Sequence, residues 1–420
     1  MAQTTFADLG IAPTLLAVLT KQGYTEPTPI QAKAIPTAVE GKDVVGIAQT
    51  GTGKTLAFGI PMIQRLGFVK GQALVLLPTR ELALQVEEVL NRIGRSFGLR
   101  TAVLIGGAGM GPQVSALRGK PHVIVATPGR LIDHLEHRTV SLEHVCILVL
   151  DEADRMLDMG FAPQIKKILA VVPGPAMRQT MLFSATMPHD IMQIATHHMK
   201  LPIRIEVAPQ GTTAERVTQE IFIVDKQNKI RLLEKVLSER PVTTLVFTRT
   251  KHGATKIMRN IRAMGHSAAE IHGNRSLGQR KEALEGFKNG RYRVLVATDI
   301  ASRGIDVTGI GLVINYDLPT DSEDYVHRIG RTARAGSEGH AISFAEPNQR
   351  RDLQDIERLI RKTLPISQLP GNLPPPRAVA EAPREYRNYG RPQSRSFAPR
   401  NQNQSRPQSG GRPAFHRRGR

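Results

Sequence analysis

The chain of 420 residues contains one cysteine and no tryptophan, and aromatic residues make up only 4% of it. A single cysteine excludes a disulfide framework and any zinc site built from several thiolates. Cys146 lies in the apolar run 145–150, which is typical of a buried strand, so we expect an unreactive core thiol. No apolar run reaches the roughly 18–20 residues of a membrane span, and the first residues lack the segments of a secretory signal. These absences predict a soluble, cytoplasmic protein.

Charge of one sign is in excess, with 57 Lys and Arg against 37 Asp and Glu and a formal net charge of +20. Such an excess favours polyanionic partners, because contacts between basic side chains and phosphates release condensed counterions. The same excess is equally typical of a surface charge that keeps a protein in solution. The position of the charges along the chain therefore matters more than their sum.

The last fifty residues, 371–420, differ in composition from the rest of the chain. They contain eleven arginines, no lysine and two acidic residues, which leaves 371–420 with a net charge of +9 and residues 1–370 with +11. Their few branched aliphatic residues cannot offset the entropy of the chain, so we predict a disordered tail over 366–420. Arginines alternate there with Tyr386, Tyr389, Phe397 and Phe415, a pattern suited to stacking on the bases and contacting the phosphates of a single-stranded nucleic acid. A passive solubilising tail is the alternative interpretation.

Residues 1–370 alternate short apolar runs with helical patterns, which predicts α/β folding with parallel sheets covered by helices. Strands are expected at 43–48, 73–77, 101–105, 122–126, 146–150, 179–183, 220–224, 243–247, 267–271, 293–297 and 311–315. The polar segment 208–215 contains Pro and Gly without periodicity and is the expected linker. We therefore predict domains over 1–207 and 216–365.

A phosphate-binding loop is the sharpest local signal, and it stands between an expected strand and an expected helix. Glycines let backbone N–H groups turn towards phosphate oxygens, the lysine can neutralise the β- and γ-phosphates of a nucleotide, and the final threonine can be a ligand for Mg²⁺. Alanine replaces the first glycine of the general pattern. The loop consists of Ala48, Gln49, Thr50, Gly51, Thr52, Gly53, Lys54 and Thr55. A second Gly-rich run at 106–111 does not have the spacing of a dinucleotide-binding fingerprint.

Two acidic residues follow the apolar run 147–150 and complete the chemistry that the loop requires. Paired acids at the end of a buried strand are unfavourable unless a cation balances them. Asp151 is the candidate Mg²⁺ ligand together with Thr55, and Glu152 is the candidate that orients and deprotonates the attacking water. Taken alone, the acids would fit an ordinary helix N-terminus; together with Lys54 they predict phosphoryl-transfer chemistry.

Together these motifs resemble those of the DEAD-box ATP-dependent RNA helicases, and their residues are most similar to those of the bacterial RhlE type. The resemblance covers about residues 6–345, in the order and spacing of the family. It implies two tandem RecA-like domains, RNA-stimulated hydrolysis of ATP with Mg²⁺, local unwinding of short RNA duplexes and remodelling of ribonucleoproteins. It also implies roles in ribosome assembly or RNA degradation, without naming a partner.

The resemblance assigns roles to individual residues of this sequence. Those that recognise the nucleotide besides the loop are Phe6, Tyr24, Gln31, Gly304 and Asp306, and the arginine fingers that reach the γ-phosphate are Arg331 and Arg334. Those that couple ATP to RNA are Asp154, Ser184, Thr186 and His327. Those that bind the RNA backbone are Thr79, Arg80, Gly107, Thr127, Gly129, Arg130, Thr248, Arg249, Gly273, Asn274, Arg280, Thr298 and Asp299.

Other functions remain open from the residues alone. An ATP-gated RNA clamp or annealing factor would carry the same motifs, and a DNA helicase is a third candidate because recognition of the 2′-OH is not visible in a sequence. A metal site of histidines is the weakest candidate. The histidines in question lie in polar helical stretches without matching acids or thiols, so we expect them to be solvated: His134, His137, His189, His197 and His198.

Overall fold

A computed structural model describes residues 4–49, 51–207, 217–299, 307, 309–332 and 339–375. Several predicted features lie outside these ranges. They are Thr50 of the loop, the linker 208–215, Gly304, Asp306, Arg334 and the part of the tail from residue 376 onwards.

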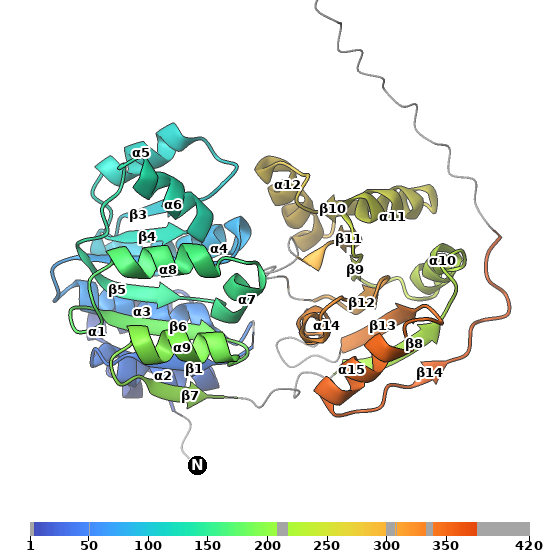
Figure 1. Cartoon of the computed structure of the whole chain (residues 1–420), viewed down its shortest axis with the longest axis horizontal. Helices are drawn as coiled ribbons and strands as arrows, with labels where there is room; N and C mark the ends of the chain where they lie inside the picture. The colour runs from blue at the N-terminus through green and yellow to red at the C-terminus, as the bar shows by residue number, and fades with distance from the viewer. Residues whose placement is uncertain are drawn as a thin grey trace, which may run out of the picture. The chain divides into compact units, whose positions relative to one another are not determined.

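The first domain is built on a parallel sheet that has seven strands in the described part of the chain (Figure 1). Their order across the sheet is β3-β4-β2-β5-β6-β1-β7. The strands are β1 (Val44–Ile47), β2 (Gln72–Leu76), β3 (Thr101–Leu104), β4 (Val123–Ala126), β5 (Val145–Leu150), β6 (Gln179–Ser184) and β7 (Ile203–Glu206).

Helices cover both faces of this sheet, because alternate strand residues point to opposite sides. Val44 packs with α1–α4 in one apolar cluster, and its neighbour Val45 packs with α6–α9 in another. The helical elements are η1 (Phe6–Leu9), α1 (Pro13–Lys21), α2 (Pro29–Val39), α3 (Lys54–Leu66), α4 (Arg80–Gly94), η2 (Arg95–Phe97), α5 (Met110–Arg118), α6 (Pro128–Glu136), α7 (Ala153–Asp158), α8 (Ala162–Val171) and α9 (His189–His198).

The second domain repeats this plan, with described strands in the order β10-β11-β9-β12-β13-β8-β14. Its strands are β8 (Val217–Ile223), β9 (Thr244–Phe247), β10 (Ala268–Ile271), β11 (Val294–Ala297), β12 (Leu312–Asn315), β13 (Gly339–Ala345) and β14 (Ile366–Ser367). Its described helices are α10 (Lys229–Glu239), α11 (Lys251–Ala263), α12 (Leu277–Lys288), α14 (Ser322–Ile329) and α15 (Arg350–Ile360). The first, second and later strands along the chain take the same positions in both sheets, which is the tandem RecA-like architecture that the resemblance implied.

The expected strands agree with β1–β6 and β8–β12 to within a few residues, whereas β7, β13 and β14 were not anticipated. The second domain also extends beyond the expected boundary at residue 365. There β14 pairs with β8, and the Arg231 guanidinium donates to the backbone oxygens of Leu373 and Pro374 at 3.2 and 2.6 Å. Residues 366–374 therefore belong to the folded domain and not to the tail.

Two further expectations concern burial and membranes. Cys146 is half-buried in β5 rather than fully enclosed, with its Sγ 3.5 Å from the Gln72 carbonyl oxygen, and burial raises the pKa of its thiol. In the described ranges, no helix combines the length and the apolar character that crossing a membrane demands.

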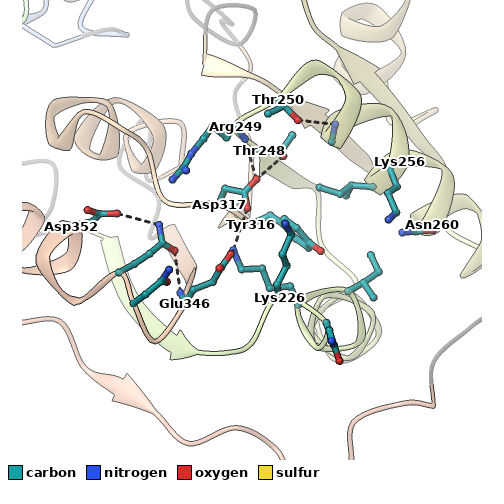
Figure 2. Close-up of a pocket in the computed structure, with 17 residues that line it drawn as sticks. Lys226, Thr248, Arg249, Thr250, Lys256, Asn260, Tyr316, Asp317, Glu346 and Asp352 are labelled. Carbon is teal, nitrogen blue, oxygen red and sulfur yellow. Dashed lines mark hydrogen bonds and ion pairs between the residues drawn. The ribbon is translucent and has the colours of Figure 1, made fainter.

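Parallel strands place all their carboxyl ends at one edge of a sheet, and the predicted motifs follow those ends. In the first domain the phosphate loop follows β1, the acidic residues follow β5 and Ser184 ends β6. In the second domain a cavity of about 690 Å³ lies beyond the ends of β8, β9, β12 and β13 (Figure 2). Functional residues are therefore expected at the carboxyl edge of each sheet.

Candidate active site

The phosphate loop joins β1 to α3, and its backbone has the conformation that its glycines permit. Gly51 and Gly53 have φ of +85° and +89°, in the left-handed region that other residues rarely adopt. Lys54 is the first residue of α3 and is 6% exposed, with its Nζ donating to the Ala48 carbonyl oxygen at 2.9 Å. The lysine therefore curls over the loop at the position where phosphates would lie.

The segment expected to recognise adenine is attached to this loop. Gln31 is 3% exposed, accepts from the Thr28 N–H through Oε1 at 2.9 Å, and donates to the Gly53 carbonyl oxygen through Nε2 at 2.9 Å. A side chain at Gly53 would collide with this amide, so the site also needs glycine there for space. Tyr24 is partly buried beside the same core, and Phe6 is 2% exposed within it. Gln31 thus braces the phosphate loop directly.

Asp151 directly follows β5 and is 2% exposed. Its Oδ1 accepts from the Glu152 N–H at 2.9 Å. Burial raises the pKa of this carboxyl to about 6, and the nearby Lys54 ammonium opposes the shift only in part. A buried carboxylate whose charge is under-compensated is the environment that a divalent cation would balance.

Glu152 differs from its neighbour in both conformation and charge balance. Its φ of +52° lies in the left-handed region, an uncommon and strained conformation for a residue with a side chain. Burial opposes its ionisation, but the cations Arg155, Lys54 and Arg331 outweigh burial and lower its pKa to about 2. Arg155 Nη1 lies 2.7 Å from Oε2, while Oε1 is buried without a hydrogen-bond partner in the described part of the chain. One carboxylate oxygen is held and the other is available.

Asp154 connects the segment after β5 to the end of β6 through hydrogen bonds. Its Oδ2 accepts from the backbone N–H groups of Ala185 and Thr186 at 2.9 and 2.8 Å and from the Thr186 hydroxyl at 3.0 Å. In return, the Asp154 N–H donates to the Ser184 hydroxyl oxygen at 3.2 Å. Four hydrogen bonds therefore join the acidic segment to the 184–186 segment.

On the expected RNA side of the first domain, Arg80 packs over the Gly106–Gly107 turn. Gly107 has a φ of +77°, and a side chain at this position would overlap the Arg80 guanidinium. Thr79 is 5% exposed, and its hydroxyl accepts from the Leu82 N–H to cap α4. The structure thus gives Thr79 a capping role and brings Arg80 and Gly107 together.

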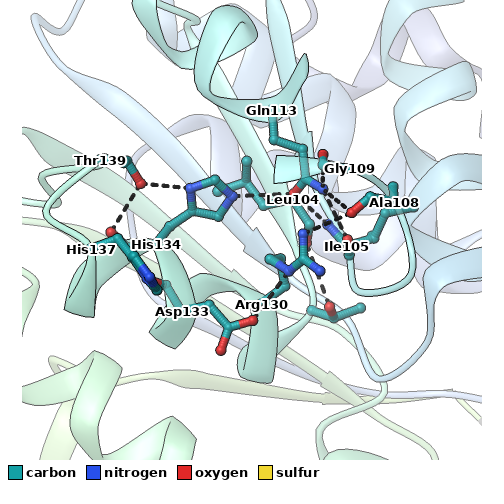
Figure 3. A network of polar contacts seen from close by, with 11 residues as sticks. Leu104, Ile105, Ala108, Gly109, Gln113, Arg130, Asp133, His134, His137 and Thr139 are labelled. Atoms are coloured by element: carbon teal, nitrogen blue, oxygen red, sulfur yellow. Dashed lines mark hydrogen bonds and ion pairs between the residues drawn. The ribbon is translucent and has the colours of Figure 1, made fainter. Parts of the chain in front are cut away.

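A buried polar network behind this turn was missed by the sequence reasoning (Figure 3). The Gln113 amide pairs with both backbone groups of Ile105, accepting from its N–H and donating to its oxygen at 3.1 Å each. His134 Nε2 lies 3.2 Å from Gln113 Oε1, and Arg130 Nη1 donates to the Ala108 oxygen at 3.0 Å. Side chains from α5 and α6 therefore fix the backbone on both sides of Gly106–Gly107.

The expectation that His134 is solvated is wrong, because this side chain is 0% exposed. Its Nδ1 lies 2.7 Å from the Thr139 hydroxyl, so both ring nitrogens have polar neighbours. Burial and the nearby Arg130 lower its pKa, which keeps the imidazole neutral. His137, His189 and His197 are exposed as expected, and no group of three or more His, Cys, Asp or Glu residues that could hold a metal ion occurs among the described residues.

The remaining expected RNA contacts of the first domain lie near α6. Thr127 precedes α6 and is 7% exposed, with its N–H donating to the Leu104 oxygen at 3.0 Å. Gly129 is in the first turn of α6, and Arg130 also forms an ion pair with Asp133 at 3.2 Å. These residues adjoin the network around Gln113.

In the second domain, the expected RNA residues are held by acids at the strand ends. Asp317 Oδ2 accepts from the Thr248 hydroxyl at 2.8 Å and from the Arg249 N–H at 3.1 Å. Asp299 accepts two bonds from Arg328, at 2.6 and 2.8 Å, and Arg328 also stacks over the Phe247 ring. Arg328 was not among the predicted residues, although it lies in the same segment as His327 and Arg331.

Three expected residues follow β10 and β11 in the second domain. Thr298 directly follows β11 and is 7% exposed, with its N–H donating to the Ile271 oxygen at 3.3 Å. Gly273 and Asn274 form an exposed turn after β10, where the Asn274 N–H donates to His272 Nδ1 at 3.3 Å. These residues thus lie at the same edge of the sheet as Thr248.

Residues of the two domains also interact with each other. Arg280 of α12 pairs with Glu81 of α4 at 2.7 Å, with side-chain exposures of 8% and 5%. His327 is influenced by Arg155 and Asp154, and burial lowers its pKa to about 3. Arg331 is 2% exposed and helps to lower the pKa of Glu152. Arg280, which is expected to bind RNA, is thus paired with a carboxylate of the other domain in this structure.

Comparison with known proteins gives one family match for each of the two domains. The DEAD/DEAH box helicase family matches residues 28–194, and the helicase conserved C-terminal domain matches residues 228–336. The DEAD-box ATP-dependent RNA helicase CshA of Geobacillus kaustophilus is 44% identical over 364 residues, covering 86% of this chain and 78% of that protein. The ATP-dependent rRNA helicase RRP3 of Candida albicans is 44% identical over 370 residues, covering 87% and 69%.

Solved structures of proteins bound to RNA and a nucleotide are similar to this chain in fold. Mss116p bound to single-stranded RNA and AMP-PNP has a TM-score of 0.81 at 28% identity, covering 88% of this chain and 80% of that one. Dbp5 of S. cerevisiae bound to RNA and ADP BeF3 has a TM-score of 0.76 at 29% identity, covering 87% and 95%. With this coverage, and with the phosphate loop and the two acidic residues after β5 in place, the chain belongs to the DEAD-box family of ATP-dependent RNA helicases.

Proposed function

We propose that Lys54, Asp151, Glu152 and Arg331 form the centre at which this helicase hydrolyses ATP. The observation that carries the proposal is the charge balance of Glu152, which depends on Arg155 and Lys54 of the first domain and on Arg331 of the second. A γ-phosphate between these groups would meet cations from both domains. Hydrolysis would then require the domains to be together, as expected for an arginine finger. Arg334 is proposed as the second finger from the motif alone.

Within this centre each residue has a distinct task. Lys54 at the start of α3 neutralises phosphate charge, and the backbone of 51–53 supplies N–H donors. Glu152 Oε1, which has no hydrogen-bond partner among the described residues, would orient the attacking water. A carboxylate with a pKa of about 2 is a weak base, so it positions the water and takes its proton late, which suits a loose phosphoryl-transfer transition state.

Magnesium fits the donor set at this place. Asp151 is buried and its charge is only partly balanced by Lys54, and Thr55 stands at the start of α3. One carboxylate and one hydroxyl, completed by phosphate oxygens and water, are typical of Mg²⁺ sites in such enzymes. We propose that Asp151 and Thr55 hold Mg²⁺, which would neutralise charge on the phosphates.

Coupling to RNA is proposed to run through two physical links. Asp154 binds the 184–186 segment directly and lies two residues after Glu152, in the first turn of α7. A shift in the position of Glu152 would therefore be passed to the 184–186 segment. The Glu81–Arg280 pair joins the segments that carry Arg80 and α12. Each ligand would favour closed domains, so ATP and RNA should raise each other's affinity. Phosphate release would then open the domains and free the RNA.

The test is duplex displacement by Glu152→Gln under multiple-turnover conditions. The affinities of the variant for ATP and for RNA are measured alongside. We expect ATP and RNA binding to persist, while kcat for ATP falls by about 10²–10⁴ and repeated unwinding stops. Glu143→Gln, a change of the same type at an exposed surface residue, is the control. Sustained unwinding without hydrolysis would instead support an ATP-gated clamp.

The finer assignments rest on composition and motif wording. We propose the RhlE type, a cytoplasmic location, and a basic tail that adds RNA affinity without sequence preference. Nucleotide recognition by Tyr24, Gly304 and Asp306 is likewise proposed. ATPase stimulation by RNA and by DNA of one sequence measures the preference between them, and equal stimulation would contradict RNA specificity of the core.

A further inference from the structure

The two domains share a strand order, so each position of the ATP site has a counterpart in the second domain. The segment after β8 corresponds to the phosphate loop after β1, and α10 corresponds to α3. Both helices begin with lysine, Lys54 in α3 and Lys229 in α10. Asp317, two residues beyond β12, corresponds in the same way to Asp151 beyond β5.

The counterpart cannot cradle phosphates, because residues 224–228 contain no glycine to turn backbone N–H groups inward. The Lys229 ammonium is paired with two carboxylates in place of a ligand. Its side chain is 2% exposed, and its Nζ lies 3.2 Å from Asp317 Oδ1 and 3.0 Å from Glu346 Oε1. A built-in ion cluster therefore stands where the first domain would hold its nucleotide.

This cluster reaches the loop after β9. While one oxygen of Asp317 binds Lys229, the other accepts from the Thr248 hydroxyl at 2.8 Å and from the Arg249 N–H at 3.1 Å. Thr250 then caps α11 by accepting from the Gly253 N–H at 2.9 Å. The position of Thr248 and Arg249 is thus set by a carboxylate that itself depends on a buried cation.

We propose that Lys229 is a positioning residue for RNA binding: it holds Asp317, and Asp317 orders the Thr248–Arg249 loop. The inference rests on the proposed RNA contacts of that loop. Without the ammonium, Asp317 and Glu346 are two neighbouring carboxylates with no cation between them, which favours protonation or rotation of Asp317. Either change weakens its bonds to Thr248 and Arg249.

The experiment compares Lys229→Met with Lys229→Arg in the full chain. For Lys229→Met we expect RNA affinity about tenfold weaker, the loss of roughly one hydrogen bond to a charged group. ATP affinity without RNA should be unchanged, because Lys54 and the phosphate loop are in the other domain. Hydrogen exchange of the Arg249 amide should be faster. Lys229→Arg can still pair with both acids and should recover most of the RNA affinity.

Lys226→Met is the matched control, since Lys226 lines the same cavity but is exposed and has no ion pair among the described residues. We expect it to leave both RNA affinity and Arg249 exchange unchanged. If Lys226→Met weakened RNA binding while folded Lys229→Met did not, the cavity would bind RNA directly and the positioning role would be refuted.

Asp317→Asn provides a second route if Lys229→Met does not fold. The amide keeps the shape but can no longer accept from both Lys229 and the loop, and Glu346 still balances Lys229. We expect weaker RNA binding and faster Arg249 exchange; unchanged values would overturn the proposal. Thr248→Ala and Arg249→Ala separate the two hypotheses. If they leave RNA affinity unchanged, the assumed RNA contacts are wrong, whatever Lys229 does.

Discussion

Replacing Gln113 with leucine should damage the RNA side of the first domain far more than its ATP side. Leucine fills similar space but has no polar atoms. The Ile105 N–H and carbonyl oxygen would both lose their bonds to the amide, and His134 Nε2 would lose its partner. Each buried backbone group left unsatisfied costs about 1–3 kcal/mol, so we expect the free energy of unfolding to fall by about 3 kcal/mol in total.

The functional consequence follows from what the network holds. Gln113 Nε2 also donates to the Gly109 oxygen at 3.1 Å, and Arg130 holds the Ala108 oxygen. The Gly106–Gly107 turn would loosen beneath Arg80. We expect RNA affinity to weaken by about tenfold, with ATP affinity in the absence of RNA unchanged.

Urea unfolding followed by circular dichroism suits this chain, since it has no tryptophan to report by fluorescence. Gln193→Leu is the control, because Gln193 is exposed on α9 and its side-chain amide nitrogen lies 2.9 Å from His189 Nε2, away from the RNA side. We expect this control to stay within about 0.5 kcal/mol of the parent. A Gln113→Leu protein as stable as the parent, with unchanged RNA affinity, would refute the argument.

Three further predictions concern charge. Burial raises the pKa of Asp151 from 3.8 to about 6, so as pH rises between these values the unfolded chain loses this proton before the folded protein does, and stability falls. Asp151→Asn should therefore raise the free energy of unfolding by about 3 kcal/mol near pH 7.5 but by only about 0.5 kcal/mol near pH 4, as urea titrations would measure. Arg155→Met should raise the pKa of Glu152 and shift the acid limb of the kcat–pH profile to higher pH. An unshifted limb would show that ionisation of Glu152 does not control it. Truncation after residue 375 should make the slope of log K against log salt shallower by about 3–4 if five tail arginines meet phosphates, and an unchanged slope would exclude the tail from binding.

Local patterns were sufficient to predict much of the fold. Apolar runs flanked by turn residues identified most strands because those strands are buried on both faces. They failed for β7, whose Arg204 and Glu206 are exposed at the sheet edge, and for β14, which has two residues. They also failed for β13, where Gly339, His340 and Ser343 interrupt the apolar pattern. These strands depend on pairing with β1, β12 and β8 more than on their own composition.

The chemistry of the phosphate site could likewise be predicted from local patterns. Glycines, lysine and acids at fixed spacing after strands predict a phosphate site, since that chemistry needs those residues close together in the chain. The partners of those residues come from distant segments and have no such spacing. Asp317 is 88 residues from Lys229, and Glu81 is 199 residues from Arg280. No local pattern joins them.

The sequence by itself determined the two-domain α/β plan, the phosphate loop, the acids and the family. Only the tertiary structure decided how charges are compensated. It buried His134, left Asp151 short of positive charge, gave Glu152 cations from two domains, and joined Lys229 to acids at the corresponding strand ends of the second domain. The physical reason is that ionisation and hydrogen bonding depend on burial and on neighbours within a few ångströms, which folding brings together from segments far apart in the chain.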